Sequence, residues 1–459
     1  MLVRELVTTS DGLPIGLVDV TRVDIDSRSC QPGSLFFALN GGTDNGIRYV
    51  DDAVARGAVG VIASQAVTTT VPTMVVSESD IFEIMVAASY RVVGGVEGVR
   101  LVGVTGTNGK TSVTTFVAQL CDTLGLPSTS IGTLTNARTT PAAPDLARLL
   151  RAARESWASD GVVALEVSSH ALDQQRVANL HFAVGVFTNL THDHLDYHHT
   201  MDDYFSAKAR LFEPERTERA IICLDTSWGR TLADARPDAI AVATSDLQNV
   251  VVSEDSLSFS WHGSQVAAPV GGMFNVTNVM LACEAVRALG FEVADIASAA
   301  STLHSVAGRF EVVGTRPLVV VDYAHTPDGL ERVLLDLKDR TTGRLFVVFG
   351  CGGDRDVEKR PAMGAIASTL ADVVIITSDN PRSEEPGAIA SAIAAGCRKD
   401  ANVSVILDRR EAIARAVEEA TEDDVVLVAG KGHEKTQETN GFVVDFDDVA
   451  VARELLNRK

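Results

Sequence analysis

The segment GVTGTNGKTS (residues 103–112) places glycines, a lysine and hydroxyl side chains between an apolar stretch and a predicted helix. Backbone amides of a glycine-rich turn and of a helix N-terminus can hold phosphate groups. Lys110 would add a charge for the β- and γ-phosphates of a nucleotide, and the hydroxyl of Thr111 or Ser112 could reach magnesium. The strict pattern needs glycine where this sequence has Val104. The segment is therefore a variant phosphate loop, and an ordinary strand-to-helix turn is the alternative.

Three groups of side chains that could bind metal or take part in catalysis follow the phosphate loop in the sequence. Glu166 ends the apolar stretch VVALE, where an unpaired carboxylate is costly to bury, so it is either a magnesium ligand or a structural acid. Lys208, in DDYFSAKARLF, would by spacing alone be a solvated surface residue. In TNLTHDHLDYHH a zinc site is conceivable, but the absence of nearby cysteine favours magnesium–nucleotide chemistry, with the histidines mainly polar loop residues. These histidines are His192, His194, His198 and His199.

Arg382 lies in TSDNPRSEEP (residues 377–386), directly after a proline and an apolar strand-like run. Because proline fixes φ, it limits where the next side chain can point, and Arg382 could be aimed at an anionic ligand. The alternative is an exposed ion pair with Glu384 or Glu385, which would contribute little. The nearby GCGGDRD is not a dinucleotide fingerprint, since the third glycine position falls on Arg355.

Alternating strands and helices must position these residues. LVGVTG, VVALEVSS, FAVGVFTNL and AIICLD read as strands, and so do LVVVDYA, RLFVVFG, DVVIITSD, SVILD and DDVVLVAG near the C-terminus. Such alternation predicts an α/β fold with parallel sheets, whose ligands lie at the carboxyl ends of the strands. A β-rich insertion is expected near residues 250–270, and breaks near VVGGVEGVR and SVAGRF. With 459 residues the chain has room for about three domains.

Composition excludes several classes. The net charge of −21 argues against non-specific nucleic-acid binding. No apolar run approaches a membrane span, and MLVRELVTTSDGLPIG lacks the pattern of a signal peptide. Six scattered cysteines fit reduced thiols rather than a disulfide framework or a zinc ribbon. We expect a cytoplasmic, monomeric protein without a membrane span.

The motifs resemble, in order, those of the Mur ligases, ATP-dependent amide-forming enzymes of peptidoglycan precursor synthesis. GTNGKT resembles their phosphate loop, DHLDYH and YFSAKARLF their metal and lysine segments, and GMFNVTN, GRFEVV and DYAHTPDGL their nucleotide-side segments. The likeness runs from about residue 20 to about residue 440. DSRSCQPGSLFFAL, TTPAAPDLARLL, EVSSHALDQQRV, FGCGGDRDVEKRPAMG, DNPR and GKGHE further resemble the MurE type. The resemblance implies a UDP-binding domain (1–96), a central P-loop ATPase-like domain with a parallel sheet (97–306) and a C-terminal Rossmann-like, amino-acid-binding domain (307–459).

The resemblance also implies site residues. Catalytic roles fall to Lys110, Lys208 and His194. ATP would be bound by Gly106, Thr107, Asn108, Gly109, Lys110, Thr111, Ser112, Asn275, Arg309, Asp322 and His325. The UDP-sugar dipeptide would be bound by Ile25, Ser27, Thr139, Thr140, Ser168, Gln174 and Arg176. The incoming amino acid would be bound by Arg355, Asp379, Asn380, Pro381, Arg382, Gly430 and Glu434. Magnesium would be held by Thr111, Glu166, His194 and Lys208, the last as a carbamate formed with CO2. Three departures affect the nucleotide-sugar contacts: Arg138 precedes the TTP segment, the loop at residues 133–139 is short, and GIRYV replaces a GHDF-like text.

The implied reaction joins UDP-N-acetylmuramoyl-L-alanyl-D-glutamate to meso-2,6-diaminopimelate through an acyl phosphate, with ATP as co-substrate and Mg²⁺ as cofactor. DNPR accompanies the diaminopimelate enzymes, because a guanidinium grips the distal carboxylate that lysine lacks. Alternatives are a ligase that adds L-lysine, a ligase like folylpolyglutamate synthetase, and a catalytically idle nucleotide-binding homologue.

Overall fold

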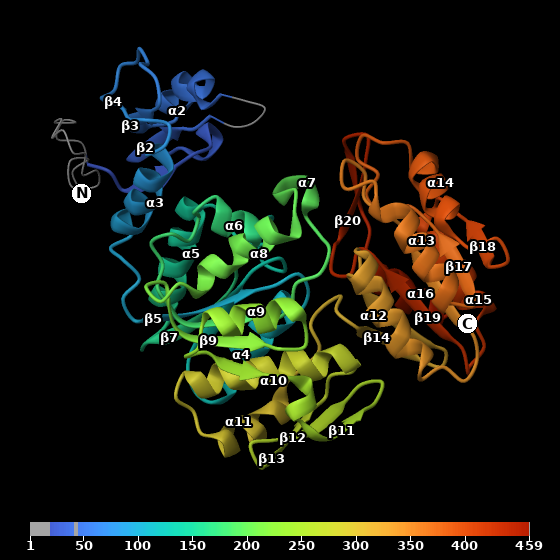
Figure 1. Ribbon diagram of the computed structural model, residues 1–459. Helices are drawn as coiled ribbons and strands as arrows, with labels where there is room; N and C mark the ends of the chain where they lie inside the picture. The colour runs from blue at the N-terminus through green and yellow to red at the C-terminus, as the bar shows by residue number, and fades with distance from the viewer. Residues whose placement is uncertain (1–18, 41–44, 459) are drawn as a thin grey trace. The chain divides into compact units, whose positions relative to one another are not determined.

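The computed structural model describes residues 19–40 and 45–458 (Figure 1). The chain forms two compact units. The first comprises Met1–Thr105, described from residue 19 onward, with Gly125–Val186 and Ser206–Ala220. The second comprises Gly106–Leu124, Phe187–Phe205 and Ile221–Lys459. The opening residues, on which the signal-peptide expectation rests, lie outside the described part.

The N-terminal part of the first unit contains a four-stranded sheet of order β1-β2-β3-β4. Its neighbouring strands pair in parallel. Apolar residues of β2, β3 and α2 pack together, including Phe36, Val61 and Ala53. The elements are β1 (Arg22–Asp24), β2 (Ser34–Ala38), α2 (Val50–Ala55), β3 (Ala58–Ala63), β4 (Thr73–Val75) and α3 (Ile81–Val92).

The middle of the chain forms a six-stranded sheet of order β10-β9-β8-β5-β7-β6. The predicted strands and the helix after the phosphate loop are confirmed. Residues 248–268 form a three-stranded antiparallel sheet, the expected β-rich insertion. The elements are β5 (Val99–Thr105), α4 (Lys110–Thr123), β6 (Ser128–Ile131), α5 (Ala143–Ser156), β7 (Gly161–Glu166), α6 (Ser169–Asp173), β8 (Phe182–Phe187), α7 (Leu195–His198), α8 (Met201–Ala209), β9 (Thr217–Cys223), α9 (Ser227–Ala235), β10 (Ile240–Val242), β11 (Gln248–Val252), β12 (Leu257–Trp261), β13 (Ser264–Ala268), α10 (Met273–Ala288) and α11 (Val293–Ala299).

The C-terminal part of the second unit is built on a sheet of order β14-β15-β19-β16-β17-β18. Only the edge pair β14–β15 is antiparallel in this sheet. A separate hairpin, β20–β21, was not predicted from the sequence. The elements are β14 (Glu311–Thr315), β15 (Leu318–Asp322), α12 (Pro327–Lys338), β16 (Leu345–Phe349), α13 (Lys359–Leu370), β17 (Val373–Ile376), α14 (Pro386–Gly396), β18 (Asn402–Val405), α15 (Arg409–Glu419), β19 (Val425–Ala429), β20 (Thr436–Thr439), β21 (Phe442–Asp445) and α16 (Asp448–Leu456).

Helices cover both faces of this C-terminal sheet. Side chains alternate along a strand, so Val320 of β15 packs with residues of α12, α13 and α14, whereas Val319 and Val321 pack with residues of α15 and α16. Strands buried on both faces read as continuous apolar runs, as LVVVD does here. This Rossmann-like arrangement places polar loops at the carboxyl ends of the strands, where the amino-acid motifs were expected.

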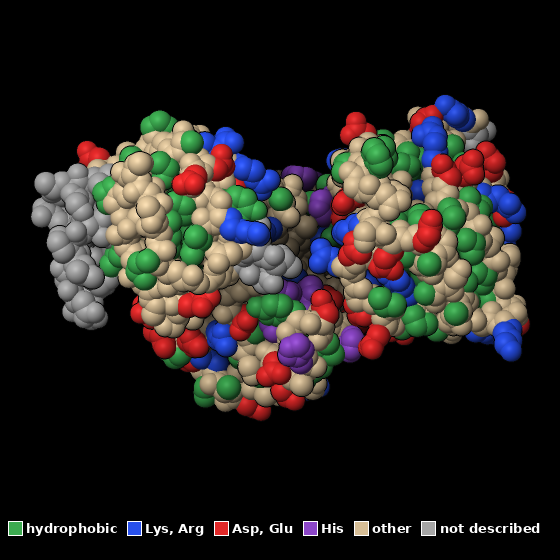
Figure 2. All heavy atoms as spheres, turned by 90° about the horizontal axis from the view of Figure 1, so that it is seen from above, with side chains coloured by type: hydrophobic (Ala, Val, Ile, Leu, Met, Phe, Trp, Pro, Cys, Tyr) green, Lys and Arg blue, Asp and Glu red, His purple; other side chains and the backbone are tan. Residues whose placement is uncertain are grey.

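The surface and the cysteines agree with the composition. Acidic and basic side chains are interspersed on the face seen in Figure 2. All six cysteines are free thiols. Within the described ranges, no helix combines the length and the apolar character that a membrane span requires.

Candidate functional site

Two glycines shape the phosphate loop. Gly106 and Gly109 have φ values of 151° and 85°, in the region that side chains disfavour. A Cβ on Gly106 would lie 1.9 Å from Thr188 Oγ1, and one on Gly109 would lie 2.5 Å from Asn278 Oδ1. Helix α4 begins at Lys110, directly after Gly109. The loop therefore runs into a helix N-terminus, as the variant phosphate loop predicts.

Val104, the departure from the strict motif, is a strand residue. It pairs with Glu166 in the parallel ladder between β5 and β7 and is fully buried. Because the turn begins only at Gly106, position 104 needs no glycine.

The chain after β8 supports the loop. Asn108 N donates to Asn189 Oδ1 at 3.0 Å, and Thr107 N donates to Asn189 O at 3.0 Å. Lys110 Nζ donates to the carbonyl oxygens of Gly106 and Thr107 at 3.0 and 2.7 Å. The role of Asn189, in TNLTHDH, was not recognised from the sequence, although the motif that contains it was.

Residues from the C-terminal segment also contact the loop within the second unit. Arg309 Nη2 donates to Thr111 Oγ1 at 3.2 Å, and its guanidinium lies 4.2 Å from the centroid of the Tyr323 ring. Asn108 Nδ2 donates to Asp328 Oδ2 at 2.8 Å. Arg309 was expected beside the nucleotide. Asp328 was missed, although it belongs to the quoted segment DYAHTPDGL.

Histidine and lysine side chains surround Asp193. Burial opposes its ionisation, but His194, His325, Lys359 and Lys110 together lower its pKa. Burial and the charge of Lys359 lower the pKa of His325 to about 4, against the pull of Asp193. Lys359 Nζ donates to the carbonyl of His325 at 2.9 Å. His325 is therefore neutral at pH 7, and Lys359 supplies a cation that the sequence did not reveal.

Two other expected nucleotide residues are buried and hydrogen-bonded. Asp322 accepts from the backbone N–H groups of Phe310 and Ala324, both at 2.7 Å, although burial raises the pKa of its carboxyl. Asn275 donates to the carbonyl of Gly271 at 2.7 Å and accepts from Asn278 at 2.9 Å. Asn278 also lies beside Gly109. Ser112 is buried in the first turn of α4.

A hydrogen-bond network in the first unit joins most residues expected to hold the UDP-sugar dipeptide. Thr140 Oγ1 donates to Glu166 O at 2.7 Å and lies 3.3 Å from Ser168 Oγ. Arg176 donates to Thr140 O at 2.8 Å and to Gln174 Oε1 at 2.6 Å. Thr139 joins the same network, because its hydroxyl lies 3.2 Å from Thr133 Oγ1.

Ile25 and Ser27 lie apart from this network in the sequence. Both are close to β1, and Ser27 begins a short 3-10 helix capped by Asp26. Arg148 of α5 donates to the carbonyl of Val23, two residues before Ile25, at 2.8 Å. Arg138 is exposed in the irregular loop before the TTP segment, whereas GIRYV is helical and forms a 3-10 turn and the start of α2.

Two of the expected metal ligands, Glu166 and Lys208, are buried. Glu166 is 2% exposed, and its carboxylate accepts from Thr133 N at 2.8 Å and from Thr133 Oγ1 at 3.2 Å. A Cβ on Gly132 would lie 2.0 Å from Glu166 Oε1, so the carboxylate needs this glycine. Lys208 is 1% exposed, so the surface position predicted from spacing alone is wrong. Helix α8 turns this lysine inward.

The histidines divide by environment. His194 has φ 55° and an imidazole that is 43% exposed, 3.5 Å from Asp193 Oδ2. His198 is buried and stacks on Tyr204 with centroids 5.2 Å apart, which makes it a packing residue. His192 and His199 are exposed.

The donor set fits magnesium by its chemistry. Across residues 19–40 and 45–458, no three or more His, Cys, Asp or Glu side chains form a metal-binding group. The expected set has only two ligands of those types, Glu166 and His194. Its other members are the Thr111 hydroxyl and Lys208, which as a carbamate would add oxygen donors. Carboxylate, hydroxyl and carbamate oxygens suit a hard cation.

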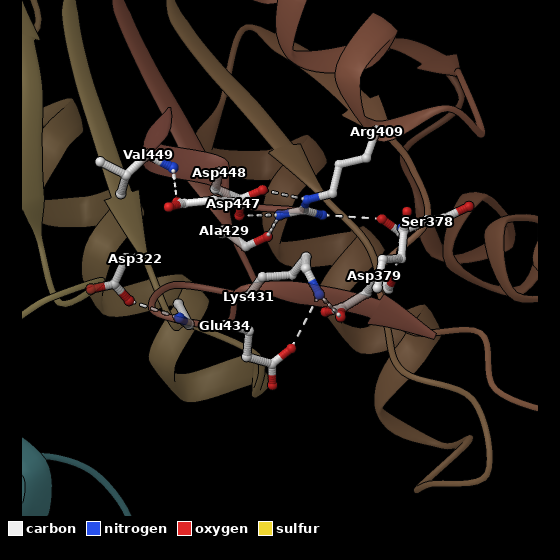
Figure 3. Close-up of polar contacts among 12 residues, drawn as sticks. Asp322, Ser378, Asp379, Arg409, Ala429, Lys431, Glu434, Asp447, Asp448 and Val449 are labelled. Atoms are coloured by element: carbon white, nitrogen blue, oxygen red, sulfur yellow. Dashed lines mark hydrogen bonds and ion pairs between the residues drawn. The ribbon is translucent and has the colours of Figure 1, made fainter. Parts of the chain in front are cut away.

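The amino-acid motifs meet at the carboxyl edge of the C-terminal sheet. Asn380 Nδ2 donates to Glu434 Oε2 at 2.7 Å, and Lys431 Nζ donates to the same oxygen at 3.1 Å. Figure 3 shows Lys431 between Glu434 and Asp379. Gly430 has φ 112°, and a Cβ there would lie 2.8 Å from Asp379 Oδ2. Burial raises the pKa of Asp379, against the charges of Arg409 and Lys431.

Arg382 contacts neither of the glutamates that the alternative interpretation named. Its Nη1 donates to the carbonyl of Gly353 at 2.6 Å, and its Nε lies 4.0 Å from Glu438 Oε2. Its backbone, at φ 53°, bridges to Thr439 of hairpin β20–β21. Pro381 is buried, whereas Arg355, on the GCGGDRD loop, is exposed.

Comparisons with known proteins bear on this arrangement. Three family models match: the Mur ligase family, catalytic domain (residues 19–94), the Mur ligase middle domain (104–286) and the Mur ligase, glutamate ligase domain (308–432). A relative from Xylella fastidiosa is 40% identical, covering 96% of this chain and 94% of its own. One from Vibrio parahaemolyticus is 39% identical, covering 95% and 94%. The chain belongs to the Mur ligase family.

Both relatives are named UDP-N-acetylmuramoyl-L-alanyl-D-glutamate–2,6-diaminopimelate ligase. A solved structure with this name is similar at 32% identity and a TM-score of 0.64, covering 96% of this chain and 95% of its own. The three-domain Mur ligase architecture expected from the sequence is thereby confirmed.

Proposed function

We propose that this Mur ligase uses ATP to add meso-2,6-diaminopimelate to UDP-N-acetylmuramoyl-L-alanyl-D-glutamate, a step of peptidoglycan precursor synthesis. The observation that carries the proposal is the state of Arg382. Its guanidinium donates to the carbonyl of Gly353 and lies 4.0 Å from the carboxylate of Glu438, whereas Glu384 is bound by Arg360. A carboxylate-bearing amino acid can therefore be bound there, as the names of the relatives suggest.

The reaction proceeds in two transfers. A carboxylate oxygen of the D-glutamate attacks the γ-phosphorus of ATP, ADP leaves, and an acyl phosphate forms. The amine of diaminopimelate then attacks the carbonyl carbon, phosphate leaves with the electrons of the C–O bond, and the nitrogen loses a proton. The phosphate loop and Lys110 stabilise the transferring phosphoryl group, because fixed charges and amide dipoles lower the barrier wherever negative charge develops.

The nucleotide would lie along the phosphate loop. Gly106, Gly109 and the start of α4 provide the turn and the helix N-terminus, and Arg309, His325 and Lys359 line its surroundings within the second unit. The hydrogen-bond network around Thr140 and Ser168 would bind the dipeptide, and Ile25 and Ser27 the uridine end. The assignment of these residues rests on the family resemblance together with the contacts described above.

Mg²⁺ would be held by Thr111, Glu166, His194 and carbamylated Lys208, and when bound it would neutralise phosphate charge. Burial of Lys208 supports the carbamate, because an ammonium is costly to bury and the neutral amine is the form that reacts with CO2. We also propose domain boundaries at residues 96/97 and 306/307, and a monomer that acts in the cytoplasm.

Phosphate release by the purified chain tests the reaction. With ATP, Mg²⁺ and UDP-N-acetylmuramoyl-L-alanyl-D-glutamate, we expect phosphate release that depends on meso-diaminopimelate. The kcat/KM for meso-diaminopimelate should be at least tenfold higher than the kcat/KM for L-lysine or for L-ornithine. Mass spectrometry should detect the tripeptide product. A preference for L-lysine would replace the proposed substrate, and release that depends on a folate would replace the reaction. A Lys110→Ala control should release no phosphate.

A further inference from the structure

Lys431 lies beneath the amino-acid loops and is fully buried. An ammonium has three N–H donors. Here they meet three oxygens: Thr436 O at 2.7 Å, Glu434 Oε2 at 3.1 Å and Asn380 Oδ1 at 3.3 Å. Every donor of this cation is therefore matched, and two of the three acceptors, Glu434 and Asn380, belong to residues that would bind the incoming amino acid.

The ammonium fixes the orientation of the Asn380 amide. Asn380 Oδ1 accepts from Lys431 and from the backbone N–H of Glu438, at 3.0 Å, while Nδ2 donates to Glu434 Oε2. A flipped amide would place its NH2 group against the ammonium and against a backbone N–H. One side-chain conformation of Asn380 is thereby selected.

The same ammonium makes the two carboxylate oxygens of Glu434 inequivalent. Oε2 accepts from both Lys431 and Asn380. Oε1 has no hydrogen-bond partner among the described residues, and the side chain is 31% exposed. The carboxylate is therefore anchored through one oxygen and presents the other to a ligand. An ammonium group is the ligand that this charged acceptor would favour.

A second buried charge nearby shows what a purely structural cation looks like. Arg409 and Asp448 are fully buried and form two hydrogen bonds of 2.7 Å. The remaining partners of Arg409 are the carbonyls of Ser378 and Ala429, which belong to the backbone of the sheet edge. Lys431 differs, because it contacts the side chains of two proposed ligand-binding residues.

We propose that Lys431 is a positioning residue that sets specificity for the distal ammonium of the amino-acid substrate. It holds Glu434 and Asn380 so that Glu434 Oε1 accepts from this ammonium. The inference rests on the proposed function and deepens it. Without the lysine, Glu434 and Asn380 lose a charged partner and can rotate, so the amino acid should bind more weakly while ATP should not.

Substitution of Lys431 tests the inference. We expect Lys431→Met to raise KM for diaminopimelate at least tenfold, with KM for ATP and for the UDP-dipeptide changed less than twofold. Lys431→Gln, which keeps two N–H donors, should fold more readily and show a smaller rise of the same kind. Lys435→Met is the matched control, since Lys435 lies four residues away, is 64% exposed and pairs with Asp447 at the surface. It should leave all three KM values unchanged.

A double-mutant cycle separates positioning from general destabilisation. If Lys431 acts through Glu434, adding Lys431→Met to Glu434→Gln should raise KM for diaminopimelate less than threefold further. Fully multiplicative effects would overturn the inference. A uniform rise of all three KM values, or failure of both Lys431 variants to fold, would show a structural role only and would also overturn it.

Turnover of diaminopimelate by the wild-type enzyme tests the proposed function independently of the role of Lys431. Turnover of diaminopimelate by the wild type, with an unchanged KM in folded Lys431→Gln, would refute the role of Lys431 alone. An absence of turnover by the wild type with diaminopimelate would refute the proposed function, and the inference with it.

Discussion

Arg360 donates two hydrogen bonds to the carboxylate of Glu384, at 2.9 and 2.8 Å, and this pair decides the environment of Arg382. The Arg360 side chain is only 4% exposed, so its charge needs a partner, and Glu384 provides it. Arg382, two residues before Glu384, is consequently not neutralised by it. Glu384, in the acidic sequence SEEP after DNPR, therefore neutralises the buried Arg360 rather than Arg382.

Removal of the Arg382 guanidinium should weaken the binding of diaminopimelate but not of ATP. We expect Arg382→Ala to raise KM for diaminopimelate at least tenfold and to leave KM for ATP nearly unchanged, because the guanidinium would grip only the distal carboxylate. Steady-state kinetics with each substrate varied in turn would measure both values. Equal increases in the two KM values would contradict the assignment.

Gly109 tests the phosphate loop. Gly109→Ala combines a left-handed backbone with a Cβ placed 2.5 Å from Asn278 Oδ1. Gly125→Ala is a close control, because Gly125 has φ 80° and nothing within 4 Å of its Cβ position. Both variants should lose roughly 1–2 kcal/mol of stability, because alanine disfavours the positive φ that these positions require. Only Gly109→Ala should also raise KM for ATP, by at least tenfold. Denaturant titration and ATP-dependent kinetics would measure the two effects, and an unchanged KM would show that this turn does not contact ATP.

Local pattern made much of this fold predictable. The strand LVVVD could be identified because both of its faces are buried, so that apolar residues occupy all but its last position. The phosphate loop could be identified because its glycines are required by φ and by close contacts that only glycine allows. In both cases a single stretch of chain carries the physical constraint.

Long-range packing explains what the sequence could not predict. Lys208 looked like a surface lysine, since its helix has ordinary polar neighbours, yet α8 buries it. Arg382 and Thr439 meet although 57 positions separate them, and hairpin β20–β21 was not foreseen. Asp328 likewise reaches Asn108 of the phosphate loop, and Lys359 reaches His325, only through folding of the second unit. Asp328 and Lys359 both lie in segments that the family resemblance singled out, but the sequence alone does not show which side chains they meet.

The buried Lys208 should be essential through its carbamate. We expect Lys208→Ala to lower kcat at least 100-fold, and short carboxylates such as formate to restore part of the activity by supplying the lost oxygen donors. Lys399→Ala, at an exposed position, should behave as the wild type. Mass spectrometry under native conditions should detect a CO2 adduct in the wild type that Lys208→Ala lacks. Full activity in CO2-free buffer, with no adduct, would contradict the carbamate.

His325 should make stability depend on pH in a defined window. Its folded pKa is about 4, below the ordinary value of 6.5, because of burial and the charge of Lys359, with Arg309 adding to this effect and Asp193 opposing it. Between these values the unfolded chain binds the proton more readily, so the free energy of unfolding falls as the pH falls. At about 1.4 kcal/mol per pKa unit, the loss attributable to His325 reaches about 3 kcal/mol near pH 4.

Replacement of this imidazole should remove that dependence. We expect His325→Gln to unfold with a shallower decline in stability than the wild type between pH 6.5 and 4, as measured by urea titration at several pH values. His199→Gln is the control, since His199 is exposed and should leave the slope unchanged. The expected slope is positive throughout the window, because the neutral form of His325 is the one that the folded chain stabilises. Identical slopes for the wild type and His325→Gln would show that His325 can take up a proton in the folded chain without cost.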